Sequence, residues 1–283
     1  MKILHEDYQI YYAKQCLICN GNATILDGNI RRECVCQKKA RRKFRFEQID
    51  IYPPDLKYKD WSDFTGIITK QDKIIGHLTT QSVLNARNKA FSYCYKAPFS
   101  LDILKNRGQY LKVHHHLDDG QNIIIAGDEQ TGKTLLAAII CKEVANASVL
   151  VNRDLDYRWI KFYDIINAAR WNLDYNTGQS KQIDHPFLDR LSELDFLFID
   201  AMDLQRGGHN SPADHISMDS LFGARILNYR PTIVICSKRV TSLLSTGPGQ
   251  EQLAAAYGFQ FMSLLKNSNN LLIELVKDVT TTS

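Results

Sequence analysis

The second half of the chain alternates short apolar runs with longer segments of helical periodicity. Runs of this length favour buried strands, and strands joined by crossover helices form parallel sheets. We expect strands at 122–126, 148–152, 159–162, 196–200 and 232–236, a last apolar run at 271–276, and helices at 135–144, 164–171 and 217–227. The pattern predicts an α/β fold with a parallel sheet and flanking helices over residues 117–283.

The first half is less regular. Turn signals at Asn20-Gly21 and Asp27-Gly28 enclose a short strand at 23–26, which predicts a hairpin. Residues 49–66 mix prolines and aromatic residues without a period, and we expect a helix at residues 79–93. We therefore divide the chain into an N-terminal module (1–48), a connector with a helix (49–116) and a large domain (117–283).

Composition is that of an ordinary folded protein, with 44% hydrophobic and 23% charged residues among 283. No stretch approaches the roughly 18 apolar residues that a membrane span needs, and the first residues contain no apolar signal segment. We expect a cytoplasmic protein without a membrane partner.

A phosphate-binding motif, G-x-x-x-x-G-K-[ST], stands between the first predicted strand and its helix. Its glycines let backbone N–H groups surround phosphate oxygens at a helix N-terminus. A glycine-containing turn with a solvated lysine is the alternative, but the strand-loop-helix placement favours ATP. Lys133 is expected at the β- and γ-phosphates, and the Thr134 hydroxyl on Mg²⁺. The expected nucleotide-binding residues are Gly127, Asp128, Glu129, Gln130, Thr131, Gly132, Lys133, Thr134 and Leu135.

A carboxylate ends the apolar run at 196–200. Asp200 follows Leu197-Phe198-Ile199, which is the arrangement that holds Mg²⁺ in phosphate-loop proteins. The alternative is a strand-terminal aspartate that stabilises a turn. With the phosphate-binding loop upstream, we predict Asp200 as the second magnesium residue.

Four of the seven cysteines form two close pairs around the predicted hairpin, as Cys16-x-x-Cys19 and Cys34-x-Cys36. Four thiolates suit a structural, tetrahedral Zn²⁺ site, and a module this small needs such support to fold. Four unpaired thiols are the alternative. We predict a zinc-ribbon-like module.

Positive charge gathers next to these cysteines. Residues 31–45 contain eight lysines and arginines against one glutamate, Glu33. Two aromatic residues, Phe44 and Phe46, accompany the charge, which suits a phosphate backbone with stacked bases. A surface for a protein partner and a merely solvated helix face remain open alternatives.

Taken in order, these features resemble the DnaC/DnaI-type replicative helicase loaders, AAA+ P-loop ATPases related to IstB-type transposition helpers. The resemblance covers nearly the whole chain: the cysteine module with its basic tail, the connector, the P-loop, LSELDFLFID at 191–200 and ARILNYRPTIVI at 224–235. It implies a parallel AAA+ sheet, ATP with Mg²⁺, and a replicative helicase and single-stranded DNA as partners. It also suggests self-assembly into a ring or spiral.

Three positions depart from the family pattern where hydrolysis is controlled. Ala201 replaces the acidic residue that polarises water, Ser237-Lys238 replaces a Ser-Asn or Thr-Asn pair, and Leu264 replaces an arginine. Losing both the carboxylate and the arginine predicts slow or absent hydrolysis.

A shifted alignment would restore these roles. Asp203 could then reach the water, and Arg225, Arg230 or Arg239 could serve a neighbouring subunit. The candidate catalytic residues are therefore Lys133, Asp200, Asp203 and Arg225.

Three functions remain. The first is a helicase-loader-like, DNA-binding ATPase in DNA replication initiation. The second is an IstB-like transposition ATPase, against which the zinc module stands. The third is a nucleotide-gated adaptor that does not hydrolyse ATP, and Ala201, Lys238 and Leu264 support it.

Overall fold

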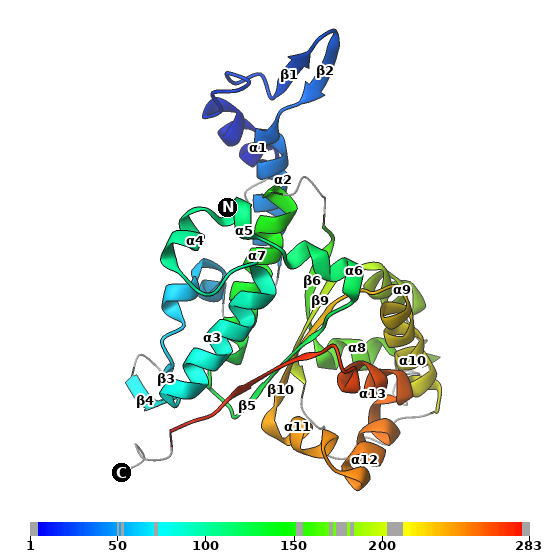
Figure 1. Cartoon of the computed structure of the whole chain (residues 1–283). Coiled ribbons are helices and arrows are strands. Elements are labelled where there is room, and N and C mark those ends of the chain that lie inside the picture. Colours follow the sequence, from blue (N-terminus) through cyan, green and yellow to red (C-terminus); the bar gives the residue numbers. More distant parts are fainter. Residues whose placement is uncertain are drawn as a thin grey trace.

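The structure is a computed structural model of the whole chain (Figure 1). It describes residues 5–49, 51, 54–70, 73–150, 155–169, 172–173, 180–181, 184–202 and 212–278. Among these residues, no helix is long and apolar enough to cross a membrane.

A five-stranded sheet forms the centre of the molecule, and all of its neighbouring strands run parallel. The strand order is β11-β5-β10-β9-β6. Counted along the chain from the strand before the P-loop, this order is 5-1-4-3-2, so β5 lies inside the sheet. The strands are β5 (Ile123–Gly127), β6 (Tyr157–Lys161), β9 (Phe196–Met202), β10 (Thr232–Ser237) and β11 (Leu271–Leu275).

Helices cover both faces of this sheet, as Figure 1 shows. Helices α3 (Thr80–Cys94) and α7 (Lys133–Leu150) cover one face. The other face is covered by α8 (Phe162–Ala169), α9 (His185–Glu193), α10 (Pro212–Leu227), α11 (Lys238–Leu244), α12 (Gly247–Tyr257) and α13 (Phe259–Lys266). The predicted parallel α/β fold is confirmed.

Two hydrophobic cores follow from the alternation of side chains along each strand. In β5, Ile123 and Ile125 face the core under α3 and α7, whereas Ile124 faces the core under α8, α10 and α13. Phe198 and Ile199 divide in the same way in β9. Since both faces are buried, the strands appear in the sequence as continuous apolar runs.

The N-terminal module stands at one end of the molecule (Figure 1). It contains α1 (His5–Lys14), the hairpin β1 (Thr24–Asp27) and β2 (Ile30–Glu33), and α2 (Val35–Glu47). The predicted hairpin is confirmed, with a two-residue turn at Gly28 and Asn29. Phe46, near the end of α2, belongs to the core under α7, so the module is anchored to the large domain.

The connector contributes to that same core. Trp61, Phe64 and Phe91 are buried with residues of β5 and α7. The domain boundaries at 48/49 and 116/117 remain predictions. Residues on both sides of each boundary belong to the same hydrophobic core. The elements from the start of the connector to the large domain are η1 (Pro54–Tyr58), η2 (Trp61–Asp63), β3 (Ile67–Lys70), β4 (Lys73–His77), α3, α4 (Leu101–Lys105), α5 (Arg107–Tyr110), η3 (Val113–His115) and α6 (His116–Asp119).

One predicted strand is wrong. Residues 148–150 belong to the last turn of α7, and residues 151–152 lie outside the described part of the chain. In this last part of α7, Val144, Ala147 and Ser148 are buried, whereas Leu150 is 49% exposed. A short apolar run does not by itself separate a strand from a buried helix end. A short hairpin, β7 (Asn172–Leu173) and β8 (Ser180–Lys181), lies further along the chain.

Candidate nucleotide site and cysteine cluster

The P-loop joins the interior strand β5 to the N-terminus of α7, as the motif predicted. Gly127 ends the strand where the backbone is crowded: a Cβ there would lie 2.8 Å from both the Leu275 carbonyl oxygen and Thr131 Oγ1. Only glycine fits without displacing the neighbouring strand. The Thr131 hydroxyl donates to the Asp128 carbonyl oxygen at 2.9 Å, which closes the loop.

Lys133 lies over this loop. Its ammonium donates to the carbonyl oxygens of Gly127, at 2.9 Å, and of Asp128. Burial lowers the pKa of Lys133, and the charges of Cys236, Asp128 and Asp200, among others, oppose that shift. The P-loop lysine and the strand-terminal carboxylate Asp200 are therefore close enough to interact electrostatically.

A β-bulge in β9 lies at Asp200. Val234 of β10 pairs with Ile199, but Cys236 pairs with Met202, so Asp200 and Ala201 together face the single residue Ile235. Bulges bend a strand and re-aim side chains, and they are frequent beside active sites. Asp200 is half-buried at the carboxyl end of the sheet, where Thr134 also lies in the first turn of α7. Their shared role on Mg²⁺ stays a prediction.

The structure does not support Arg225 as a residue that serves a neighbouring subunit. Its side chain has no exposed surface. The guanidinium donates to the carbonyl oxygens of Leu191, Leu194 and Pro231 at 2.6 to 2.9 Å and to Thr232 Oγ1 at 2.9 Å. Leu191 and Leu194 lie at the C-terminus of α9, where a cation is favoured by the helix dipole. Arg225 is thus a structural link between α10, α9 and β10.

Burial lowers the pKa of Arg225 to about 9, so the guanidinium remains charged at neutral pH. Of the other arginines considered, Arg230 forms an ion pair with Asp195 and Arg239 is exposed on α11. Asp203 lies outside the described residues.

Lys238 and Leu264, two of the departures from the pattern of the resembled proteins, differ in burial. Ser237 pairs with Gly127, so Lys238 starts α11 beside the P-loop and is exposed. Leu264 is completely buried in the core under α13. Leu264 therefore contributes apolar packing at the position where the sequence resemblance implies an arginine. Ala201 belongs to the bulge of β9.

One aromatic residue near the P-loop was missed by the sequence analysis. Phe64, which follows η2 in the connector, is 2% exposed, and its Cε2 lies 3.6 Å from where a Cβ would stand on Gly132. Residues 49–66 show no period, so nothing in the residue pattern signalled this contact.

The sheet order, the P-loop on its interior strand and the carboxylate two strands away together settle the fold. The chain has an AAA+ fold. No protein-family model matches this AAA+ chain, and no curated protein does either.

Among solved structures, the AAA+ chain is similar to a DnaC helicase loader, to DnaI and to a protein described as a primosome component from Streptococcus pyogenes serotype M3. The DnaC similarity has 19% identity over 56% of this chain and 80% of that chain, with a TM-score of 0.38. The DnaI similarity has 15% identity over 79% and 94%, with a TM-score of 0.46. The third has 16% identity over 84% and 97%, with a TM-score of 0.43. Similarities this distant carry no argument about function.

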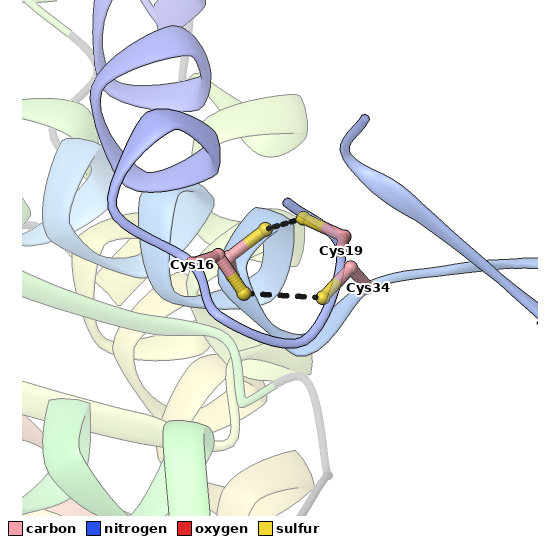
Figure 2. Close-up of side chains that lie close together, drawn as sticks. Cys16, Cys19 and Cys34 are labelled. Atoms are coloured by element: carbon pink, nitrogen blue, oxygen red, sulfur yellow. Dashed lines mark hydrogen bonds between the residues drawn. The ribbon is translucent and has the colours of Figure 1, made fainter. Parts of the chain in front are cut away.

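The four predicted zinc ligands do come together. The sulfur atoms of Cys16, Cys19, Cys34 and Cys36 all lie within 4.8 Å of one another. Cys16 Sγ is 3.6 Å from Cys34 Sγ, and Cys19 Sγ is 3.6 Å from Cys36 Sγ. Figure 2 shows the Cys16 and Cys34 sulfurs facing each other. A tetrahedron of sulfurs about 2.3 Å from one zinc ion has edges of about 3.8 Å, so the donor set fits zinc.

The thiols of this cluster differ in acidity. Backbone N–H groups of Cys19 and Ile18 lower the pKa of Cys16 to about 7. Burial raises the pKa of Cys34, and it raises that of Cys36 to about 12. A zinc ion, when bound, supplies the positive charge that holds such buried sulfurs as thiolates. The other three cysteines, Cys94, Cys141 and Cys236, are buried in the two cores.

The basic tail forms most of α2, and part of its charge is paired. Arg41 forms an ion pair with Glu33, and Lys43 Nζ is 2.6 Å from a Glu47 carboxylate oxygen. Lys39 is exposed. Large apolar side chains are also exposed on the module: Leu17 (93%), Ile18 (63%), Leu26 (77%) and Ile30 (60%). The module therefore exposes both apolar and basic side chains.

Proposed function

We propose that this chain is a helicase-loader-like AAA+ protein that binds Mg²⁺-ATP, a replicative helicase and single-stranded DNA during the initiation of DNA replication. The observation that carries the proposal is the P-loop at the carboxyl end of β5, at the same edge of the parallel sheet as Asp200 near the end of β9. The order of motifs along the chain supports the loader assignment over other AAA+ functions.

Each residue of the nucleotide site has a stated role in this proposal. Backbone N–H groups of 128–134 surround the phosphates, Lys133 neutralises them, and Thr134 and Asp200 hold Mg²⁺. The Lys133 ammonium already lies against the carbonyl oxygens of Gly127 and Asp128. It has only to turn toward the phosphates when the nucleotide binds.

The same site supports a second function, a nucleotide-gated adaptor that binds ATP without splitting it. Leu264 and Arg225 are both buried within the fold and available to no neighbouring subunit. Ala201 has no carboxylate to polarise water. These observations favour slow hydrolysis in the loader as well, so binding and turnover have to be measured separately.

The cysteine module is proposed to hold one structural zinc ion and to present the partner surface. Its exposed leucines and isoleucines lie beside the zinc ligands and on the hairpin, where Arg31 and Arg32 are exposed too. Exposed apolar side chains together with exposed basic residues suit an acidic protein surface as well as nucleic acid.

Lys133→Ala tests the nucleotide site. Because the alanine cannot neutralise phosphate charge, we expect the affinity for a fluorescent ATP analogue with Mg²⁺ to fall by about a hundredfold or more. The control is Lys105→Ala, which removes an exposed lysine that pairs with Asp102. Equal affinity of wild type and Lys133→Ala would disprove nucleotide binding at this loop.

Affinity purification from host cells tests the partner. The loader proposal expects a replicative helicase to co-purify, and it expects single-stranded DNA to be retained in moderate salt. Recovery of a transposase without a helicase would instead support the IstB-like alternative.

A further inference from the structure

A carboxylate is completely buried on the helix that follows the P-loop. The side chain of Glu143, on α7, has no exposed surface. A buried carboxylate is costly unless hydrogen bonds and opposite charge compensate it. Trp61 Nε1 donates to Oε1 at 2.9 Å, Asn146 Nδ2 donates to Oε2 at 2.9 Å, and the Arg107 guanidinium lies 3.8 Å from Oε1.

The tryptophan in this set comes from the connector. Trp61 is also fully buried and packs edge-on against Phe91 of α3, with ring centroids 5.1 Å apart. The preceding residue, Asp60, accepts a hydrogen bond from Trp61 N at 2.7 Å and pairs with Arg107 at 2.8 Å. The Trp61–Glu143 hydrogen bond and the Asp60–Arg107 ion pair therefore hold the short helix η2 against α7 and α5.

The connector reaches the P-loop directly after this fixed turn. Phe64 caps the C-terminal end of η2, three residues beyond Trp61, and its ring lies against Gly132. A shift of η2 would carry Phe64 with it. The Trp61–Glu143 hydrogen bond therefore determines the position of the Phe64 ring beside the P-loop.

The same segment contacts the N-terminal module at its other end. Lys57 Nζ donates to the Glu47 carbonyl oxygen of α2 at 2.8 Å, and Tyr58 Oη donates to the Glu47 carboxylate at 3.4 Å. Lys142 of α7 donates to the Lys59 carbonyl oxygen at 3.0 Å. Residues 57–64 thus form a continuous bridge between α2 and the P-loop.

We propose that Glu143 is a positioning residue for the nucleotide site, which holds Trp61 so that Phe64 stays against Gly132 and so couples nucleotide binding to the placement of α2. The coupling rests on the proposed function, because it requires a nucleotide at the loop. It adds a route by which ATP at the P-loop and a partner at the cysteine module influence each other.

Two variants weaken the contact: Glu143→Gln keeps the size of the side chain, and Trp61→Phe keeps a buried aromatic ring but not the full volume of the indole. Trp61→Phe loses the indole N–H, and Glu143→Gln loses the charge that attracts Arg107 and strengthens the bond from Trp61. A hydrogen bond to a charged group is strong, so we expect each variant to bind the fluorescent ATP analogue about tenfold more weakly.

The matched control is Asn146→Ala. It deletes the other hydrogen bond to Glu143 but leaves the connector attached, because Asn146 belongs to α7 itself. We expect it to lower the thermal midpoint while changing nucleotide affinity less than about twofold. If Trp61→Phe and Glu143→Gln fold and bind at wild-type affinity, or if all three variants lose affinity equally, the positioning role is wrong.

Trp61 emission provides a readout that a purely structural bond would not move. In the full chain with Trp159→Phe and Trp171→Phe, Trp61 is the remaining tryptophan. Saturating Mg²⁺-ATP should shift its emission, and adding Glu143→Gln should abolish that shift. Binding without any change in emission overturns the coupling alone, whereas no binding by the wild type overturns the proposed function and the coupling with it.

Discussion

Charged side chains in this protein take their roles from their surroundings rather than from their type. Lys133 lies at a loop where burial is partial and carboxylates are near, so it is available to phosphate. Arg225 has a similar charge but is enclosed, and its donors are used by backbone carbonyl oxygens of three residues and one hydroxyl. The first residue is placed to act on a ligand and the second to hold elements together.

Arg225→Ala is expected to destabilise the protein by about 3 to 5 kcal/mol, since it leaves several buried acceptors without donors. Chemical denaturation followed by circular dichroism measures this. Arg239→Ala, on the exposed surface of α11, should leave the free energy of unfolding within about 0.5 kcal/mol of wild type. A stable Arg225→Ala variant that has lost only ATPase activity would restore the arginine to a catalytic role.

At the scale of elements, contacts between neighbours in space decide local detail. The bulge in β9 gives Asp200 and Ala201 one common partner in β10. The N-terminus of α13 is capped from another helix, because Asp219 Oδ1 of α10 accepts a hydrogen bond from Gln260 N at 2.8 Å. The cap needs Gly258, whose φ is +89° and whose position allows the carboxylate to approach.

Gly258→Ala tests this cap. The new Cβ would stand 2.3 Å from Asp219 Oδ1 and the backbone would be strained, so we expect a loss of about 1 to 3 kcal/mol. Gly247→Ala, at the start of α12, is the control, because a Cβ there meets nothing within 4 Å. Thermal denaturation of both variants compares them, and equal midpoints would contradict the argument.

The cysteine module depends on its metal in our proposal. Cys36→Ser should lower the zinc content from about one ion per chain to nearly none, and the α1, β1 and β2 elements should lose their protection against proteolysis. Metal analysis and limited proteolysis measure the two effects. Cys94→Ala, in the core under α3 and α7, should keep its zinc. A full zinc content in Cys36→Ser would exclude this donor set.

At the scale of the whole molecule, our proposal joins a P-loop that holds a nucleotide with slow or absent hydrolysis. In the described part of the chain, Leu264 lies in the core under α13 and Arg225 is fully buried. Assembly of several copies would therefore have to provide any catalytic cation from another residue.

Measuring the steady-state rate of ATP hydrolysis tests whether the protein holds ATP without splitting it. We expect turnover at least about a hundredfold below the roughly 10 per second typical of enzymes, with or without single-stranded DNA. Ala201→Glu, which restores a carboxylate beside Asp200, should raise turnover about tenfold or more without a matching gain in affinity. Ordinary AAA+ turnover in the wild type would remove the adaptor alternative.

Local patterns in the sequence were enough to predict the parallel sheet, the P-loop and the cysteine hairpin. Each depends on residues that are neighbours in the chain: apolar runs, glycines at fixed spacing, and paired thiols around a turn. The run at 148–152 shows the limit of such patterns, because a short apolar run can belong to the end of a helix as well as to a strand.

The tertiary structure alone decided which charged residues are enclosed and which parts of the connector reach the site. The Trp61–Glu143 bond joins residues 82 positions apart, and Arg225 meets Leu191 across 34 positions. Burial and hydrogen-bond partners at such separations follow from how helices pack on the sheet. No spacing in the sequence encodes that packing, so only the folded structure shows which residues of the connector lie beside the P-loop.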